Sequence, residues 1–511
     1  MKKSQQSTSP LVIGIDSSTS ATKAIVVNDE GDTLALGRAP IDLLTPRMHQ
    51  YEHDPRQWWE STRIAIREAV GQLGEEERAR IRALSISHQR ETFACVDEQG
   101  NALRPAILWL DSRAGEQIRR YGSDEIHRLS GKPADTTPAI YKLAWLKEHE
   151  PDTLEAAAFV VDVHAYLTHE LTGRWVSSTG SADTLNLFDI AAQTWSDELL
   201  EIAGVRRDQL PELAKPGEII APLSANLAKE WGLGEVDIVA GLGDGQAAGL
   251  GTAATEDGVA YLNVGTSIVS GIHADEYRFG RQYRTLVAGI PGWYVLESVQ
   301  NSGSVLGNWF RKEFGNPELE GAPDAALEQE SAQVPAGSEG LLTLPYWNAV
   351  QSPYWNPFAR GAVVGYGSSH TRAHAYRSLL EGMAFELALN LEGMAEGANT
   401  QIRELRAVGG GSRSDLWRQI LCDVTGIDIV QSTIDEVSAQ GAAVLAMVAA
   451  RRFKSVNEAA QAMAHLGDRT SPNPEAQSRY DAWKPVHRKI YPAIAAIYDD
   501  IQRVSKELGD L

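Results

Sequence analysis

The feature that most constrains the fold is a strand–turn–strand pattern that occurs once in each half of the chain. Residues 11–28 form two apolar segments joined by a turn rich in Ser and Thr, and residues 259–272 repeat this arrangement. Short apolar segments separated by turn residues predict β-hairpins. Because the same plan appears twice, the sequence suggests a duplicated core rather than two unrelated domains.

Helical segments alternate with the strands. Asp54 followed by Pro55 is a typical helix start, and the apolar spacing continues to about residue 73. Residues 373–394 predict a long helix, and residues 438–451 predict one rich in alanine. The chain has 511 residues, 43% of them hydrophobic, which is too many for one compact core. The sequence therefore predicts an α/β protein with two large domains.

The charge balance limits the partners. The formal net charge is -21, whereas proteins that bind nucleic acid or anionic membranes normally carry a basic face. We therefore expect no nucleic-acid partner, no membrane partner and a neutral substrate. A nucleoside triphosphate stays admissible, because metal ions and backbone amides hold phosphates without bulk positive charge.

Cysteine usage and hydropathy indicate the compartment. Only Cys95 and Cys422 occur, and their wide spacing argues against a disulfide framework. The N-terminal segment is polar after its first lysines, and no run approaches the roughly 18 apolar residues that a membrane helix needs. We expect a soluble, cytoplasmic protein without an export signal.

The first motif suited to chemistry follows the first strand and contains Asp16, Thr19, Ser20 and Lys23. Such a turn offers backbone N–H groups and hydroxyls to phosphate oxygens, and a carboxylate at a strand end can hold Mg²⁺. Asp and Ser also form turns for purely conformational reasons. The motif alone therefore leaves a structural role open.

The second motif is GLGDGQAAGLG, residues 241–251, in which Asp244 lies between two glycines. Glycine on each side lets a ligand approach closely, so Asp244 is either a turn carboxylate or a general base beside the substrate. The overlapping Gly249-x-Gly251-x-x-Ala254 superficially matches a dinucleotide-binding fingerprint. It lacks a clear strand–helix–strand context, which disfavours an NAD site.

Two further turns have the size and composition of nucleotide-binding elements. Gly265, Thr266 and Ser267 form a second turn suited to phosphate. Residues 407–412 run from a strand into three glycines, where the backbone can pass close to a flat base or a ribose. The sequence has no G-x-x-x-x-G-K-[ST] motif, so a nucleotide site here is not a P-loop.

Two histidines invite a metal hypothesis that we set aside. His49 and His53 are four residues apart, but no further His or Cys lies nearby to complete a site. We interpret both as exposed loop histidines.

In combination, these segments make the chain resemble the FGGY family of carbohydrate kinases over nearly its whole length. The order of the segments carries the specificity, because each is unremarkable alone. They are IGIDSSTSATKAIVV, AILWLDSRA, YKLAWLKEHEP, GLGDGQAAGLG, GTS, SPYWNPFARGAVVGY, HAYRSLLEGMAFE, AVGGGSRSDLWRQILCDVTG and EVSAQGAAVLA.

The resemblance implies two actin-like, ribonuclease H-like domains with mixed central sheets and an interdomain cleft that holds MgATP and a sugar. It implies an N-terminal domain over residues 1–247, with the sugar site and the catalytic base, and a C-terminal domain over residues 248–511, with the nucleotide site. Asp16 would lie near Mg²⁺, and Asp244 would be the general base. The residues expected to bind ATP or its phosphates are Thr19, Ser20, Lys23, Gly265, Thr266, Gly410, Gly411 and Ser412.

The chain also departs from the family pattern at three positions. Ser18 stands where family members usually have glycine, which alters the turn but adds a hydroxyl. Gly245 follows the expected base where glycerol kinases carry glutamine, so one polar contact is lost. Ala139 stands where a small hydroxyl residue or proline is usual.

The substrate residues point in two directions. Arg90 and Glu91 resemble the glycerol kinase pair that grips neighbouring hydroxyls, and Trp109 matches an apolar wall of that pocket. An Arg and Glu pair suits a polyol, because one side chain donates and the other accepts hydrogen bonds. A surface ion pair is the alternative for these two residues. The segments LRPAILWLDSRA and KLAWLKEHEP, by contrast, resemble xylulokinases.

We expect an ATP-dependent kinase that phosphorylates a hydroxyl of a small neutral sugar, with a ketopentose such as xylulose or a related polyol as substrate. Its expected partners are this sugar and MgATP, and a homodimer is an open option. Glycerol kinase is the alternative within the family. An actin-like ATPase switch and a non-catalytic sugar sensor are alternatives of another class.

Overall fold

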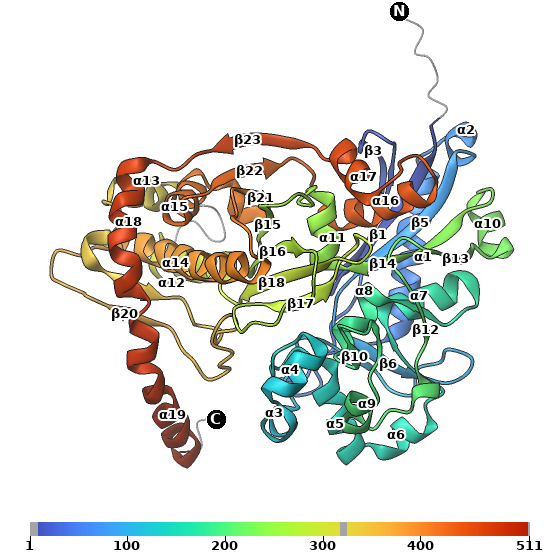
Figure 1. The fold of residues 1–511 in the computed structure, drawn as a ribbon, viewed down its shortest axis with the longest axis horizontal. Helices are drawn as coiled ribbons and strands as arrows, with labels where there is room; N and C mark the ends of the chain where they lie inside the picture. Colours follow the sequence, from blue (N-terminus) through green and yellow to red (C-terminus); the bar gives the residue numbers. More distant parts are fainter. Residues whose placement is uncertain (1–8, 317–323, 509–511) are drawn as a thin grey trace, which may run out of the picture.

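The computed structural model describes residues 9–316 and 324–508 and contains two large mixed β-sheets with helices packed against them (Figure 1). The two sheets belong to the two halves of the chain. A smaller sheet, in the order β4-β7-β6-β8, forms a lobe beside the first one. Its strands and the helices around it are β4 (Glu52–His53), β6 (Phe93–Val96), β7 (Ala106–Ile107), β8 (Phe159–Asp162), α3 (Gly115–Tyr121), α4 (Asp124–Ser130), α5 (Ala139–His149), α6 (Pro151–Ala156) and α9 (Asp197–Ala203).

The first large sheet has six strands in the order β13-β14-β5-β1-β2-β3. Strands β1, β5 and β14 run parallel, and Ser17 and Gly243 both pair with His88, so the carboxyl ends of the three strands lie level. The strands are β1 (Leu11–Ser17), β2 (Ala21–Val27), β3 (Thr33–Pro40), β5 (Ile81–His88), β13 (Ile219–Pro222) and β14 (Asp237–Gly243).

The second large sheet has seven strands in the order β17-β18-β16-β15-β21-β22-β23. Strands β15, β21 and β22 run parallel, and the other neighbouring pairs are antiparallel. The strands are β15 (Val259–Val264), β16 (Ile268–Ala274), β17 (Arg284–Val287), β18 (Tyr294–Gln300), β21 (Glu404–Val408), β22 (Asp428–Ser432) and β23 (Leu466–Thr470).

The two large sheets follow one plan. Starting from β13 in the first and from β23 in the second, each has an antiparallel edge strand, two parallel strands, the first strand of a hairpin and then two antiparallel strands. The edge strand precedes its neighbour in the first half of the chain and follows it in the second, and β17 is an addition. The duplicated core that the sequence suggests is confirmed, as is the α/β class.

The helices repeat as well. The first half contains α1 (Pro55–Gly71), α7 (Val163–Thr172) and α11 (Asp244–Gly251), and the second contains α14 (Arg372–Ala398), α15 (Asp415–Thr425) and α16 (Val437–Ala449) at corresponding places. The predicted start of α1 is confirmed, because the Asp54 side chain accepts a hydrogen bond from the backbone N–H of Arg56. Helix α14 is followed by Asn399, whose left-handed backbone closes the last turn.

Helices α11 and α16 join the two halves. Helix α16, from the second half, packs on the first sheet, and a Cβ atom at Gly14 of β1 would lie 2.0 Å from the carbonyl oxygen of Ala439. A Cβ atom at Gly441 would lie 1.8 Å from the carbonyl oxygen of Ala247 on α11. Only glycine allows such close approach. The N-termini of the two helices meet, since the Ser438 hydroxyl donates to the Asp244 carbonyl at 3.1 Å.

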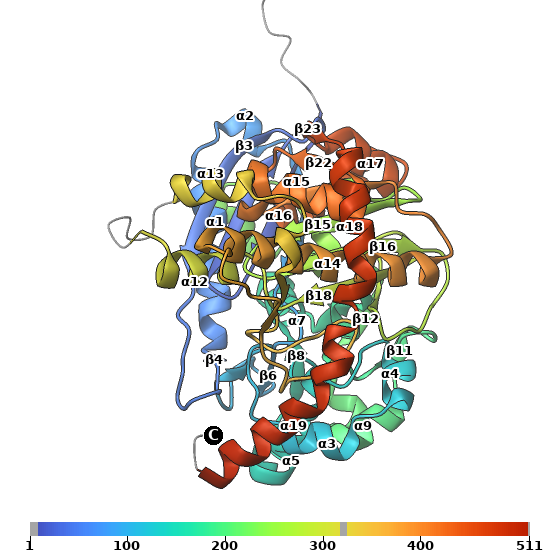
Figure 2. The same ribbon diagram turned by 90° about the vertical axis from the view of Figure 1, so that its left-hand side faces the viewer.

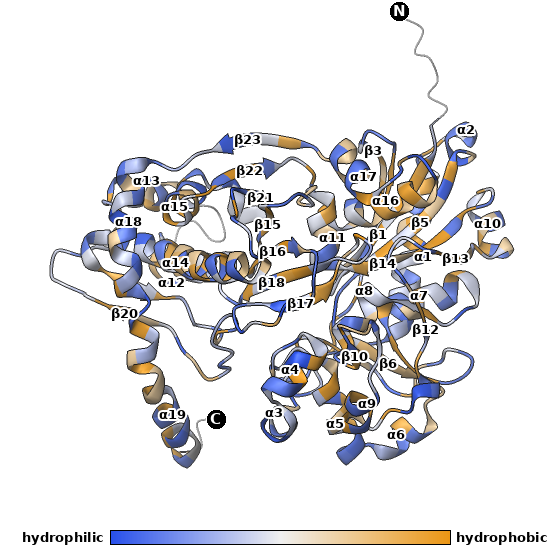
Figure 3. Cartoon of the chain, in the orientation of Figure 1, coloured by the Kyte–Doolittle hydropathy of each residue, from blue (hydrophilic) through white to orange (hydrophobic). Residues whose placement is uncertain are grey.

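Apolar residues concentrate in the central strands, such as β14 and β18, whereas the outer helices mix polar and apolar residues (Figure 3). Figure 2 shows α18 (Pro474–His487) and α19 (Ile490–Leu508) running along one side of the molecule. Within residues 9–316 and 324–508, no helix combines the length and the apolar character of a membrane span. Cys95 and Cys422 are both buried thiols, so they form no disulfide.

Candidate active site

The carboxyl ends of the three parallel strands in the first sheet bring three predicted motifs together. Asp16 lies at the end of β1, Arg90 follows the end of β5, and Asp244 is the first residue of α11 directly after β14. Parallel strand ends meet at one edge of a sheet, which is where α/β proteins bind ligands. The contact is direct, because the Arg90 Nε and Asp244 Oδ1 atoms are 2.8 Å apart.

Asp244 is accessible but held on one side. Its side chain is 43% exposed, and its Oδ1 atom also accepts from the backbone N–H of Gly245 at 2.8 Å. The flanking glycines make room for neighbouring side chains. A Cβ atom at Gly243 would lie 2.5 Å from Cδ of Arg90, and one at Gly245 would lie 2.4 Å from Oε2 of Glu297. The absence of a side chain at residue 245 therefore has a packing reason that the sequence does not reveal.

Asp16 is buried beside other carboxylates. Burial is the largest cause that raises its pKa to about 7, and the charges of Asp244 and Glu436 raise it further, whereas Lys23 and a hydrogen bond from Ser87 lower it. Such a carboxylate gains from a nearby cation, because a positive charge offsets both burial and repulsion. The surroundings of Asp16 thus fit a bound Mg²⁺ ion.

Lys23 connects the two halves. Its Nζ atom pairs with a carboxylate oxygen of Glu436, the residue immediately before α16. Glu436 has no role in our sequence analysis, although it begins the segment EVSAQGAAVLA. The signal that could have found it is its position, because it immediately precedes α16, the helix that corresponds to α11.

The turn after β1 is linked to the residues expected around the sugar. The Trp109 indole N–H donates to the Thr19 hydroxyl at 3.0 Å, and that hydroxyl donates to Gln89 Oε1 at 3.4 Å. The Ser18 hydroxyl donates to the Ala21 carbonyl at 2.8 Å and thereby closes the turn. Ser20 is exposed. Trp109 therefore donates a hydrogen bond to this turn, in addition to offering an aromatic surface.

Arg90 and Glu91 do not form a surface ion pair, so that alternative is wrong. Both are buried, and each pairs with a side chain from the second half of the chain. Arg90 Nη1 lies 2.9 Å from Glu297 Oε1, and Glu91 Oε1 lies 2.7 Å from Arg284 Nη1. Our sequence analysis missed Glu297 and Arg284. Glu297 carries a signal, because it follows the apolar residues at the start of β18 and a charge is costly to bury without a partner. Arg284 is the first residue of β17 and carries no comparable signal.

In the second sheet, β15 and β21 run parallel and bring two further motifs to one edge. The turn from Gly265 to Ser267 joins β15 to β16 and exposes Thr266. The start of α12 (Ser304–Phe314) supports this turn, because the backbone N–H of Gly303 donates to the Thr266 carbonyl at 3.0 Å. The turn is thereby fixed while its threonine side chain remains free to face a ligand.

The glycine-rich loop after β21 lies against the end of β15. Gly409 has a φ of 90°, and a Cβ atom there would lie 2.7 Å from the Val264 carbonyl oxygen. Gly410 is exposed with open space above it, whereas Gly411 packs on Trp417. The buried Ser412 hydroxyl donates to the Gly409 carbonyl at 2.7 Å and closes the loop. Among Gly410, Gly411 and Ser412, which we expect along the nucleoside, Gly410 is the residue with open space beside it.

The interpretation of both histidines as exposed is wrong for His53. His49 is exposed, but His53 is buried, and its Nδ1 atom accepts a hydrogen bond from the Trp58 indole at 3.1 Å. Burial lowers its pKa to about 4, so the ring is neutral. In the part of the chain that the structure describes, no group of three or more His, Cys, Asp or Glu residues is arranged to hold a metal ion.

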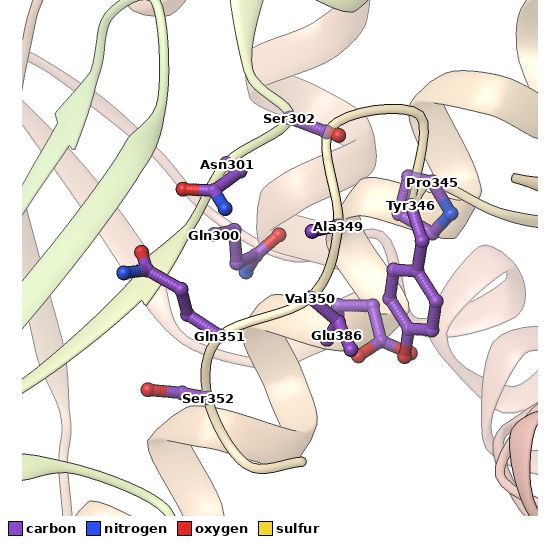
Figure 4. A pocket seen from close by; sticks show the side chains of 10 residues that line it. All are labelled: Gln300, Asn301, Ser302, Pro345, Tyr346, Ala349, Val350, Gln351, Ser352 and Glu386. Atoms are coloured by element: carbon purple, nitrogen blue, oxygen red, sulfur yellow. The ribbon is translucent and has the colours of Figure 1, made fainter. Parts of the chain in front are cut away.

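Two hollows lie apart from these motifs. One, of about 10 Å³, has room for a single water molecule and is lined by Tyr346, Glu386 and the end of β18 (Figure 4). The other, of about 830 Å³, is an open depression formed by α15, the start of α18 and the end of α13 (Ala325–Gln333). Neither is lined by Asp16, Arg90 or Asp244.

Comparison with known proteins agrees with this geometry. The family model described as the FGGY family of carbohydrate kinases, N-terminal domain, matches residues 11–251, and the model of the C-terminal domain matches residues 260–450. A xylulose kinase of Escherichia coli is 31% identical over 94% of this chain and 98% of its own. A glycerol kinase of Thermococcus onnurineus is 31% identical over 88% and 90%. The crystal structure of xylulose kinase from Lactobacillus acidophilus superposes with a TM-score of 0.90 at 26% identity, covering 96% of this chain and all of that one.

Proposed function

The chain belongs to the FGGY family of carbohydrate kinases, and from that premise we propose that it transfers the γ-phosphate of ATP to a hydroxyl of a ketopentose such as xylulose or a related polyol. The observation that carries the proposal is the placement of Asp244. It is a half-exposed carboxylate at the start of α11, held on one oxygen by Arg90 at the edge where Asp16 also lies.

Asp244 acts as the general base. Both of the hydrogen-bonding contacts described above fall on Oδ1, so we assign Oδ2 to the attacking hydroxyl, whose proton it accepts. Phosphoryl transfer depends mainly on alignment and on stabilisation of charge, and a base held in one orientation serves the first of these needs. The buried environment of Arg90 strengthens its hold on the carboxylate.

We assign the remaining predicted residues to MgATP. Asp16 holds Mg²⁺, which when bound neutralises charge on the phosphates. The support for this assignment is the raised pKa of Asp16, because a buried carboxylate next to a second one favours a cation. Residues Thr19, Ser20, Lys23, Gly265 and Thr266 contact the phosphates, and Gly410, Gly411 and Ser412 lie along the nucleoside. The first domain, residues 1–247, then binds the sugar, and the second, residues 248–511, binds the nucleotide.

Arg90, Glu91 and Trp109 line the sugar pocket in this proposal. The xylulose kinase relative and the xylulokinase-like segments favour a ketopentose. Glycerol is the second candidate, because Arg90 and Glu91 resemble the residues that glycerol kinases use and a glycerol kinase is also 31% identical, although over a smaller share of the chain. The reducing cytoplasm is the compartment that the two buried, unpaired cysteines favour.

The test is an ADP-release assay over ketopentoses, tetritols, pentitols, glycerol and aldoses, with the phosphorylated position assigned by NMR. We expect a ketopentose or its polyol to exceed glycerol at least tenfold in kcat/KM. A preference for glycerol would show that the proposed substrate is wrong, while the proposed reaction, phosphoryl transfer from ATP, would stand. ATP turnover that ignores every sugar would indicate a nucleotide-driven switch, and no turnover with any sugar would indicate a sensor.

A further inference from the structure

Five charged side chains form one continuous network that begins at the proposed base and crosses between the halves of the chain. Asp244 Oδ1 lies 2.8 Å from Arg90 Nε, and Arg90 Nη1 lies 2.9 Å from Glu297 Oε1. The same Glu297 oxygen lies 2.7 Å from Arg284 Nη2, and Arg284 Nη1 lies 2.7 Å from Glu91 Oε1. Negative and positive charges alternate along the whole series, so each charge has a partner.

Glu297 is the centre of this network. It lies on β18 with none of its side chain exposed, and it contacts Arg90, Arg284 and the Tyr261 hydroxyl. Burial by itself would raise the pKa of this carboxyl, but the two arginines lower it to about 2. The two arginines therefore favour the ionised form of Glu297.

The geometry of Arg90 transmits the position of Glu297 to Asp244. Nη1 of Arg90 contacts both carboxylate oxygens of Glu297, at 2.9 and 3.1 Å, while Nε contacts Asp244. A guanidinium group is planar and rigid, so fixing one edge fixes the direction in which the other edge donates. Without Glu297, Arg90 would be free to rotate or to place a second donor on Asp244.

We propose that Glu297 is a positioning residue for phosphoryl transfer: acting through Arg90, it fixes the Asp244 carboxylate in the orientation from which Oδ2 accepts the proton of the sugar hydroxyl. The inference rests on the proposed function, in which Asp244 is the base. Glu297 belongs to the second sheet and Arg90 to a loop of the first. The orientation of the base therefore depends on contact between the two halves.

The first experiment is Glu297→Gln, which removes the charge and keeps the shape. We expect kcat, per folded enzyme at saturating sugar and ATP, to fall 10- to 100-fold, while the KM for ATP stays within twofold of wild type. The KM for ATP should stay unchanged because the glutamine leaves the phosphate turns and the glycine-rich loop untouched. An unchanged kcat in the folded variant would overturn the proposal.

The matched control is Glu381→Gln on α14. Glu381 is also fully buried, and it also contacts an arginine and a tyrosine hydroxyl, Arg377 and Tyr480, but it has no contact with the site. We expect Glu381→Gln and Glu297→Gln both to lose thermal stability, but only Glu381→Gln to keep wild-type kcat. A comparable fall of kcat in both variants would mean that Glu297 acts only through stability.

If Glu297→Gln does not fold, Glu297→Asp keeps the charge but withdraws the carboxylate by one methylene group. We then expect a folded enzyme whose kcat falls five- to tenfold, and wild-type turnover would overturn the proposal.

The double variant that combines Glu297→Asp with Arg90→Lys gives a further test, because lysine cannot bridge two carboxylates in fixed geometry. The double variant should be no slower than Arg90→Lys alone, whereas multiplied losses would show that Glu297 acts by another route.

Asp244→Asn separates failure of the inference from failure of the proposed function. Near-normal turnover of Asp244→Asn would show that Asp244 is not the base, and the inference would lose its premise. An inactive Asp244→Asn enzyme beside a fully active Glu297→Gln enzyme would keep the base and reject only the positioning role.

Discussion

The two halves of the molecule share one strand order but carry different chemistry at corresponding strand ends. In the first half, the strand ends and the residues just after them hold charged side chains, Asp16, Arg90 and Asp244. In the second half, the corresponding places hold Thr266 in a small turn and a glycine-rich loop with Gly410. The difference teaches that the same strand plan can carry charged side chains at its strand ends in one half and close backbone approach in the other.

The helices that follow the last parallel strands make the comparison sharper. Each has an acidic residue at its N-terminus, which suits the positive end of a helix: Asp244 is the first residue of α11, and Glu436 immediately precedes α16. Asp244 pairs with Arg90 from its own half, whereas Glu436 pairs with Lys23 from the other half. The two carboxylates thus make different contacts, within one half for Asp244 and between the halves for Glu436.

The largest expected effect comes from comparing substitutions at Asp244 and Glu436. Asp244→Asn should lower kcat about a thousandfold, because general-base catalysis contributes roughly 10²–10⁴ in rate, while the KM for ATP and the melting temperature stay near wild type. Steady-state kinetics with the preferred sugar checks this. Glu436→Gln is the matched control, and we expect its kcat to fall less than tenfold. Equal losses in the two variants would break the distinction between the halves.

The next effect concerns the glycine-rich loop of the second half. A methyl group at Gly410 would meet no protein atom within 4 Å, so Gly410→Ala should fold normally. If the nucleoside lies along this loop, the methyl group meets the ligand, and the KM for ATP should rise about tenfold with kcat and melting temperature preserved. Gly71→Ala on α1 adds the same group to equally open space and should change nothing. An unchanged KM for ATP in Gly410→Ala would move the nucleotide away from this loop.

Much of this arrangement follows from sequence because it is local. The hairpins at residues 11–28 and 259–272, the cap at Asp54 and the helix over residues 373–394 depend on neighbours in the chain, and the structure contains each of them. The convergence of Asp16, Arg90 and Asp244 also follows, once three parallel strands are placed side by side.

The parts that sequence reasoning missed depend on long-range pairing. Glu297 and Arg90 are 207 positions apart, and nothing in either segment names the other. The glycine at residue 245 looked like the loss of a polar contact, whereas a side chain there would collide with Glu297. His53 looked exposed because its neighbours in sequence are polar, yet Trp58 and the turn after β1 cover it.

The smallest expected effect concerns Glu386, a buried carboxylate of the second half. It tests whether burial raises the pKa of a carboxyl group that lies apart from the proposed active site. Glu386 lies beside Tyr346 (Figure 4). Burial is the largest cause that raises the pKa of Glu386 to about 7, the value that Asp16 reaches beside Asp244, while the charge of Arg488 lowers it.

Because the folded protein holds the Glu386 proton more tightly than the unfolded chain, the stability contribution of this group is full below pH 4.5 and is lost as the pH rises through 7. Glu386→Gln is always neutral, so it should melt a few degrees above wild type at pH 8, reflecting at most about 3 kcal/mol, and the gap should narrow as the pH falls and close below pH 4.5. Thermal melts of the ligand-free protein across this range check the prediction. Glu396→Gln, an exposed position on the same helix, should show no such dependence, and a constant gap for Glu386→Gln would mean that Glu386 is already ionised in the folded protein.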